Sequence, residues 1–539
     1  MNKYYYKFLK INKKIIKKYK NSNKNIFLID RGRFWHAFTS AVAAAALSKK
    51  YKSNVLIFSD KKNESEIVKF YKSFGFENFN FGLSYKFLIS KLILFINSII
   101  LTFKTIVNIK LKGLTWFIKE FKVENINIGD LIYDEYIRFN HSYLNPKVDV
   151  KFIKILLVSI IKTKNFIQLM KKYKPKLIFV STSGKSGNTG ISIRVGVHKK
   201  IKVIELSANT KKINNYIIHD FSRIFYGKNR ILQKKKGFKE FQKYTKNFNN
   251  KKLDKFINDR FKALNKIISD KPKNKLILNA TSIPGAGNMI NFKGDRSNFL
   301  FSRNELIKKF TLNKSINTKL IFIAPHAFSD SPHDGGLDMI FDDYYSHFKE
   351  TLFFINKNIY NKNILWLVKP HPVSGHYKEN GIVERLVKKM NNKNIILCPK
   401  NISSHNLTLT CDHAVTARGS VGLEFACQGK YSITAAFAAY SKLGICLEPK
   451  NKNQYFSYLQ NIANLPKLNS KQTLKAKKIL YFLETKEQDN RLKNSIIYSE
   501  FIGNSQKTFF NKKLINNYEK INSFENDPYY NDIANKFII

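Results

Sequence analysis

The sequence predicts an α/β protein with two Rossmann-like domains that face a cleft, a helical connector between them, and helices at the C-terminal end. Three observations lead to this prediction. The chain has 539 residues, which is too long for one ordinary domain and fits two or three. Strand-like apolar runs alternate with helix-forming segments in the first half, and the alternation returns in the second half. Ligands are therefore expected outside the carboxyl ends of the strands.

Two strand–loop–helix–strand units account for the first half. One begins with NIFLID and continues through a polar loop into the Ala-rich segment AFTSAVAAAALSKK, which favours a helix. The other begins with KLIFVST and continues through SGKSGNTG into a helix near 190–199. SGKSGNTG is not a P-loop, because the Gly needed five positions before Gly184 is replaced by Phe179. The strands expected in this half are 25–30, 54–59, 176–182 and 202–206.

The second half repeats this logic and ends in helical sequence from about residue 452. The division that follows is an N-terminal domain (1–270), a C-terminal domain (271–505) and a frayed, Asn-rich tail (506–539). The strands expected here are 275–280, 319–325, 363–370, 394–399, 413–417 and 431–436. The helices expected between them are 341–359, 379–391 and 419–430.

The net charge of +57, from 95 Lys+Arg against 38 Asp+Glu, suggests a nucleic-acid partner at first sight. Nearly all the cations are Lys, and they are spread along the whole chain. This pattern favours a general Lys-rich surface and predicts no nucleic-acid partner. Attraction to an anionic membrane surface remains an alternative, since each nearby basic residue contributes about 1 kcal/mol.

The most apolar stretch, 86–118, is interrupted by Lys91 and Lys104, so it contains no clean uncharged run of about 18 residues. Core or interdomain helices are the first expectation, and an interfacial helix with Trp116 at the boundary is the second. The four Cys show no paired spacing, and the N-terminus has no apolar region typical of a secretory signal. These features predict a cytoplasmic protein, with peripheral contact at the inner membrane as an option.

Two strand-end loops have the composition of an anion-binding site. LVKPHPVSGHY places Lys369, His371 and His376 after a buried strand, and Lys and His suit phosphate oxygens. The alternative is a structural turn whose His caps a carbonyl.

The other loop, ARGSVGLEFACQGK, opens a helix whose first amides favour an anion. Glu424 is expected to meet ribose hydroxyls, or else only to compensate the helix dipole. The residues expected to contact the ligand are Arg418, Gly419, Ser420, Gly422 and Glu424.

The loop after strand 319–325 forms a third candidate site. A catalytic or substrate-positioning loop is favoured, and a purely structural loop is the main alternative. A metal site is least favoured, because H-x6-H is not a recognised metal spacing. Asp342 and Asp343 are interpreted as N-terminal charge of the next helix. The polar residues of this loop are His326, Asp330, His333 and Asp334.

The segments WLVKPHP and HAVTARGSVGLEFACQGK resemble the capsule polysaccharide biosynthesis glycosyltransferases, a group that includes Kdo transferases of the GT-B type. SDSPHDGGLDMIFDDYYSHFKETL and IGDLIYDEYIR are similar to segments of that group, and the similarity is best over 320–450. The resemblance implies that the C-terminal domain holds a nucleotide sugar, with Lys369 and His371 near its phosphate and Glu424 near its ribose. Tyr431 follows Gly-Lys where the family usually has an apolar or Pro-containing continuation.

These observations predict a metal-independent glycosyltransferase with a nucleotide-sugar co-substrate, no further cofactor, and a surface glycan or glycolipid as acceptor. His371 is expected to be catalytic, His326 to contact the donor, and Asp334 or His333 to deprotonate the acceptor hydroxyl. DRGRFWHAF and GDLIYDEYIR are expected to bind an acceptor or to form an internal salt-bridge network. The alternatives are a polyol-phosphate transferase, a nucleotide-sugar epimerase, and a non-catalytic basic membrane-surface protein.

Overall fold

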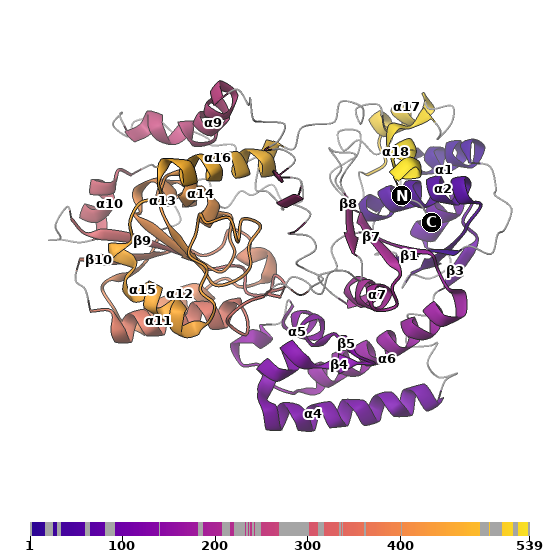
Figure 1. Cartoon of the computed structure of the whole chain (residues 1–539), viewed down its shortest axis with the longest axis horizontal. Helices are drawn as coiled ribbons and strands as arrows, with labels where there is room; N and C mark the ends of the chain where they lie inside the picture. The colour runs from indigo at the N-terminus through magenta and orange to yellow at the C-terminus, as the bar shows by residue number, and fades with distance from the viewer. Residues whose placement is uncertain are drawn as a thin grey trace.

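The structure is a computed structural model of the 539-residue chain (Figure 1). It describes residues 3–16, 25–29, 34–59, 65–80, 92–138, 141–181, 187–206, 216–219, 232, 235–236, 238–239, 242, 250–268, 301–310, 317–333, 336, 338–360, 363–399, 402–485, 495, 509–520 and 526–536. The expected strand 275–280 lies outside these residues.

The first domain is built on a six-stranded sheet in the order β3-β2-β1-β6-β7-β8. Its strands pair in parallel except for β8, which is antiparallel to β7. This is the strand order of a doubly wound Rossmann sheet. Successive strands are added on one side of β1 up to β3 and then on its other side from β6 onward, while β1 and β6 themselves are parallel. The strands are β1 (Asn25–Ile29), β2 (Asn54–Phe58), β3 (Asn78–Asn80), β6 (Leu177–Ser181), β7 (Lys202–Leu206) and β8 (Tyr216–His219).

Both ends of the described chain pack on this first sheet (Figure 1). Phe509 and Phe510 are buried in one core with Phe8 of α1 and Phe34 of α2. The frayed tail expected at 506–539 is therefore wrong for its described part, because aromatic side chains between the Asn residues find an apolar partner only in the folded domain. The helices around this sheet are α1 (Lys3–Ile15), α2 (Phe34–Tyr51), α3 (Glu66–Ser73), α7 (Gly187–His198), α17 (Lys512–Glu519) and α18 (Pro528–Lys536).

A helical layer inserted between β3 and β6 extends the first domain (Figure 1). Gly129 opens α5 where a Cβ atom would lie 1.9 Å from the carbonyl oxygen of Phe117, so glycine allows α5 to pack closely on the end of α4. The layer contains α4 (Leu92–Glu120), the hairpin β4 (Lys122–Val123) and β5 (Ile126–Asn127), α5 (Gly129–Ile137), the 3₁₀ turn η2 (Ser142–Leu144) and α6 (Val150–Tyr173).

The second domain has a five-stranded, fully parallel sheet in the order β11-β10-β9-β12-β13. β10 is buried at every position, as expected for a parallel strand covered on both faces. The strand order switches sides between β9 and β12, which lie next to each other in parallel. The loops after these two strands therefore meet at the topological switch point. The strands are β9 (Lys319–Ala324), β10 (Ile364–Val368), β11 (Ile395–Leu397), β12 (His413–Thr416) and β13 (Ser432–Thr434).

Helices cover both faces of the second sheet. Residues of α9 (Asn250–Ile268) share a core with α14 (Val421–Cys427) and α16 (Ser470–Thr485), so α9 belongs to this domain although the expected boundary lay at 270. The physical reason is amphipathicity: Leu253 and Ile257 require an apolar surface. The remaining helices are α10 (Arg303–Phe310), α11 (Tyr344–Asn358), η3 (Ser374–Tyr377), α12 (Ile382–Met390), α13 (Ser404–Thr410), α15 (Lys452–Gln460) and η4 (Ile462–Asn464).

The predicted fold class is confirmed: the protein is α/β and contains two Rossmann-like sheets with C-terminal helices. Each expected strand within the described residues is present. The strands β3, β4, β5 and β8 were not expected, because each has only two to four residues.

Candidate functional site

Helix α5 lies on the side of the first domain that is nearest the second domain (Figure 1). Two side chains on one face of α5 contact residues of the second domain. Tyr133 and Asp134 are adjacent to Asp130 in the i, i+3, i+4 pattern, which places all three side chains on the same side of the helix. The Tyr133 hydroxyl donates a hydrogen bond of 2.5 Å to Asp343, a buried residue of the second domain. Asp343 also accepts from the Ser346 amide as the N-cap of α11, which confirms its interpretation as helix-terminus charge.

Asp134 and His333 form a buried carboxylate–imidazole pair across the same junction. His333 Nδ1 lies 2.7 Å from Asp134 Oδ1, and the His333 backbone amide also points at this carboxylate. His333 is 7% exposed, and its Nε2 has no hydrogen-bond partner among the residues that the structure describes. A carboxylate that holds Nδ1–H leaves Nε2 as the proton acceptor, so the pair has the construction of a general base.

Burial and neighbouring charges shift the pKa values of His333, Asp134 and Asp130 in different directions. Burial opposes a charged imidazole, but Asp134 and Asp130 outweigh it and raise the pKa of His333. Burial also raises the pKa of Asp134. For Asp130, burial is outweighed by Arg194, whose guanidinium contacts both carboxylate oxygens at 2.5 and 2.6 Å and lowers the pKa. GDLIYDEYIR therefore contributes both an internal ion pair and a member of the candidate site.

A stack of rings lies at the strand ends of the second domain. The His326 ring stacks on Tyr344 with centroids 4.2 Å apart and on His371 with centroids 5.1 Å apart. Arg418 lies 5.6 Å from the Tyr344 ring and donates to the carbonyl of Pro332, the residue before His333. The loops after β9, β10 and β12 thus meet as expected.

His371 does not have the charge expected of it. Burial, together with the neighbouring His326, lowers its pKa to about 3, so the imidazole is neutral at neutral pH. Its Nδ1 accepts a 3.3 Å hydrogen bond from the Val373 amide, which requires the proton to be on Nε2. His371 can therefore donate one hydrogen bond to a ligand, but it cannot act as the cationic phosphate group that the sequence suggested.

The other residues expected to contact the ligand lie in different parts of the second domain. Lys369 is buried at the end of β10, next to the ring stack in sequence. Glu424 is buried on α14 near Tyr440. The small size of Gly422 is explained by packing, since a Cβ atom there would lie 2.2 Å from the Tyr440 hydroxyl.

The Gly419 carbonyl accepts a hydrogen bond from the Tyr440 hydroxyl. Ser420 is the N-cap residue of α14, but its side chain makes no capping hydrogen bond. Arg418 contacts the ring stack, and Lys369 directly follows β10. The ligand roles of Gly422 and Glu424 stay predictions. Gly419 and Ser420 stay predictions.

Sequence reasoning missed Asp134, Tyr133 and Glu379 as individual site residues. Glu379 accepts from the amides of Phe328 and Ser329 at 2.9 and 2.8 Å, which holds the loop after β9 in place. Nothing local marks Glu379, because its partners lie 50 residues away. Asp134 had a signal in its acidic, Tyr-rich segment, but only the folded chain shows its partner.

Several predicted residues lie outside the described part of the chain. Asp334, Arg31 and Arg33 belong to this group, as do residues 183–186 of the SGKSGNTG loop and the side chain of His36. Within the described residues, no three His, Cys, Asp or Glu side chains are grouped so as to hold a metal ion.

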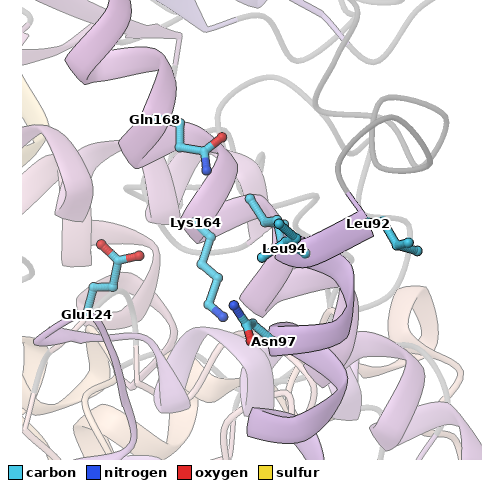
Figure 2. A pocket seen from close by; sticks show the side chains of 7 residues that line it. Leu92, Leu94, Asn97, Glu124, Lys164 and Gln168 are labelled. Carbon is cyan, nitrogen blue, oxygen red and sulfur yellow. The ribbon is translucent and has the colours of Figure 1, made fainter.

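A surface hollow of about 510 Å³ lies elsewhere, between the start of α4 and α6 (Figure 2). Lys164 and Asn97 point toward each other across it, and Glu124 lies on its far side. Burial lowers the pKa of Lys164. This hollow has no described residue in common with the Asp134–His333 pair, so it is not the candidate active site.

No family model matches the chain, and no curated protein matches it. Solved structures with similarity include S. aureus MnaA with UDP, at 9% identity and a TM-score of 0.26, covering 85% of this chain and 91% of that chain. UDP-GlcNAc 2-epimerase from Neisseria meningitidis bound to UDP-GlcNAc has 12% identity and a TM-score of 0.24, covering 85% and 99%. A glycosyltransferase from Rickettsia africae ESF-5 has 11% identity and a TM-score of 0.24, covering 95% and 99%. Likenesses this weak carry no argument about substrate or activity.

Proposed function

We propose that the protein is a glycosyltransferase that moves a sugar from a nucleotide-sugar donor to a surface or capsular polysaccharide acceptor. The observation that supports it most is the buried Asp134–His333 pair at the junction of two Rossmann-like domains, in which no described residue bonds to His333 Nε2. A general base at such a junction suits a reaction in which one domain holds the donor and the other holds the acceptor.

In this proposal, His333 Nε2 accepts the proton of the acceptor hydroxyl while the sugar leaves its nucleotide. Asp134 holds the ring and stabilises the imidazolium that forms, so it acts as a positioning residue. The carboxylates of Asp134 and Asp130 outweigh burial and raise the pKa of His333, which makes its imidazole a stronger base for the acceptor proton. The base and the donor site then belong to loops that meet at the second sheet.

The leaving phosphate requires positive charge or hydrogen-bond donors. Lys369 and Arg418 supply charge at the ends of β10 and β12, and neutral His371 supplies one Nε2–H donor. In this proposal these groups stabilise the leaving phosphate without a metal ion. The free, buried thiols of the four cysteines suit a reducing compartment, and we place the enzyme in the cytoplasm on that ground.

A nucleotide-sugar epimerase is the second candidate, because the same free Nε2 can take a proton from the donor's own sugar. The two reactions differ in their need for an acceptor. A transferase consumes donor only when acceptor is present, whereas an epimerase converts donor alone. A non-catalytic basic protein would bind polyanions with strong salt dependence and show no preference among nucleotides.

The test begins with thermal-shift measurements against CMP-, UDP-, GDP- and CDP-linked sugars, followed by donor turnover with and without a surface-glycan extract from the source organism. We expect one nucleotide to raise the melting temperature and its sugar to appear on the glycan. His333→Gln should stop transfer and keep the nucleotide-dependent shift. His198→Gln, at the end of α7, is the matched control. Turnover without acceptor would favour the epimerase, and unchanged transfer by His333→Gln would reject the assigned base.

A further inference from the structure

Helix α4 buries three hydroxyl side chains and exposes several large apolar ones, unlike an ordinary surface helix. Its inward face contacts α5 and α6 and includes three hydroxyl side chains. Ser98, Thr102 and Thr105 are buried and donate to carbonyls four residues earlier in their own helix, at 2.7, 2.8 and 2.7 Å. These three hydroxyls are thereby satisfied within the helix, and they lie on the inward face beside the buried Leu94 and Ile109. Other large apolar side chains of α4 remain on the outside.

The outward face is a continuous apolar stripe, which we call the outer stripe. Its residues recur at intervals of three and four, so they form one line along the helix. Most are at least half exposed, and Figure 1 shows α4 at the outer edge of the molecule. The outer stripe consists of Ile93 (78% exposed), Ile96 (46%), Ile100 (47%), Phe103 (66%), Val107 (54%) and Leu111 (76%).

Cations border this stripe. At about 100° per residue, Lys104 and Lys110 project about 60° to either side of its centre, and both are exposed. Gly113 has a φ of 82° and interrupts the helix just beyond Leu111. Lys112 then lies 5.3 Å from the Trp116 ring, so an aromatic–cation pair follows the end of the stripe. Apolar centre, basic edges and a terminal Trp are the features of a helix that lies in a membrane interface.

We propose that the outer stripe of α4 lies on an anionic lipid surface, with its apolar side chains inserted and Lys104 and Lys110 among the headgroups. Length and composition alone would allow α4 to cross a membrane. The packed inward face argues for a helix parallel to the membrane plane, since Ser98 and Thr105 are already covered by protein.

A second copy of the chain is the competing occupant. Pairing two stripes would bring Lys104 and Lys110 of each copy together between two chains of net charge +57. That repulsion is absent on an anionic bilayer, where each basic residue near the surface is attracted. Charge complementarity therefore favours the lipid.

The placement also links the surface to the candidate site. The Thr115 hydroxyl, just beyond the stripe, donates a 2.7 Å hydrogen bond to Asp342, the neighbour of Asp343. A lipid-linked acceptor would thus be delivered near the Asp134–His333 pair. This step rests on the proposed function, whereas membrane binding itself does not.

The test is sedimentation of the purified full chain with vesicles of phosphatidylcholine alone and with 30 mol% phosphatidylglycerol, each at low and high NaCl. We expect binding to the anionic vesicles that weakens with salt. Ile100→Ser/Phe103→Ser should weaken binding by about tenfold for each side chain. Lys104→Ala/Lys110→Ala should weaken it by about fivefold for each lysine. Phe353→Ser, which replaces an aromatic 41% exposed on α11, is the matched control and should bind as wild type.

Light scattering without vesicles completes the test. A protein whose mass is unaffected by Ile100→Ser/Phe103→Ser agrees with the proposal. Wild-type vesicle binding by both double variants would overturn it. So would a dimer that the serine variant dissociates, combined with no binding to vesicles. Because no donor or acceptor is used, this result is independent of the outcome for glycosyl transfer.

Discussion

Replacing Asp134 with asparagine removes the negative charge that lies 2.7 Å from His333 Nδ1 while it preserves the shape of the side chain. Two unit charges about 4 Å apart interact by about 4 kcal/mol at an effective dielectric constant of 20. Part of this attraction is offset by burial, which opposes the charged imidazole. The net effect of Asp134 is to raise the pKa of His333, so the substitution should lower it.

The pH dependence of the transfer rate should shift in the same direction as the pKa of His333. Neutral His333 is the active form of a base, so activity rises as pH increases through its pKa. In Asp134→Asn that rise should occur at lower pH, because the imidazolium has lost its stabilising partner. The maximal rate should nevertheless fall about 100-fold or more, since the amide does not hold the ring or stabilise imidazolium as a carboxylate does.

The direct assay is NMR titration of ¹³C-labelled histidine, which requires no substrate. The His333 signal is assigned by its absence from His333→Gln. We expect it to titrate above the ordinary value of about 6.5 in the wild type and lower in Asp134→Asn. Asp254→Asn, which replaces an exposed carboxylate on α9, should leave the signal unchanged. Identical titration of His333 in wild type and Asp134→Asn would refute the reasoning.

Three further predictions concern other parts of the structure. His371→Ala should abolish transfer while leaving the fold intact, with a melting temperature lowered only by the loss of its stacking on His326; wild-type transfer would remove its assignment. Asp130→Asn leaves the buried Arg194 guanidinium without its carboxylate and should cost about 3–5 kcal/mol in urea unfolding, and a loss below 1 kcal/mol would contradict this. Gly422→Ala should destabilise by about 1–3 kcal/mol through its clash with the Tyr440 hydroxyl. Tyr440→Phe in the same chain should recover part of that loss, and absence of recovery would show that the clash is not the cause.

Predictions from sequence succeeded best where the signal is local. The run NILWLV required a buried strand, and the structure places β10 there with every residue covered. Asp343 preceded an amphipathic segment and proved to be the N-cap of α11. His326 and His371 were singled out because they follow strands, and parallel strand ends converge at one edge.

Predictions failed where the deciding partner is remote. Phe509 and Phe510 looked like part of a polar tail, because their core partners are nearly 500 residues away. His371 looked cationic, because sequence does not reveal the burial that lowers its pKa. The need for glycine at position 422 likewise depends on a remote partner, because the Tyr440 hydroxyl lies where its Cβ would be.

The sequence by itself determined the two α/β sheets, since alternating apolar runs and helix-forming segments specify strands and helices locally. It also determined that polar residues would gather at the strand ends. Only the tertiary structure decided that Asp134 of one domain would face His333 of the other, and that the outer stripe of α4 would remain exposed. The physical reason is that burial, charge pairing and pKa depend on side chains far apart in the chain, which come within a few ångströms only after folding.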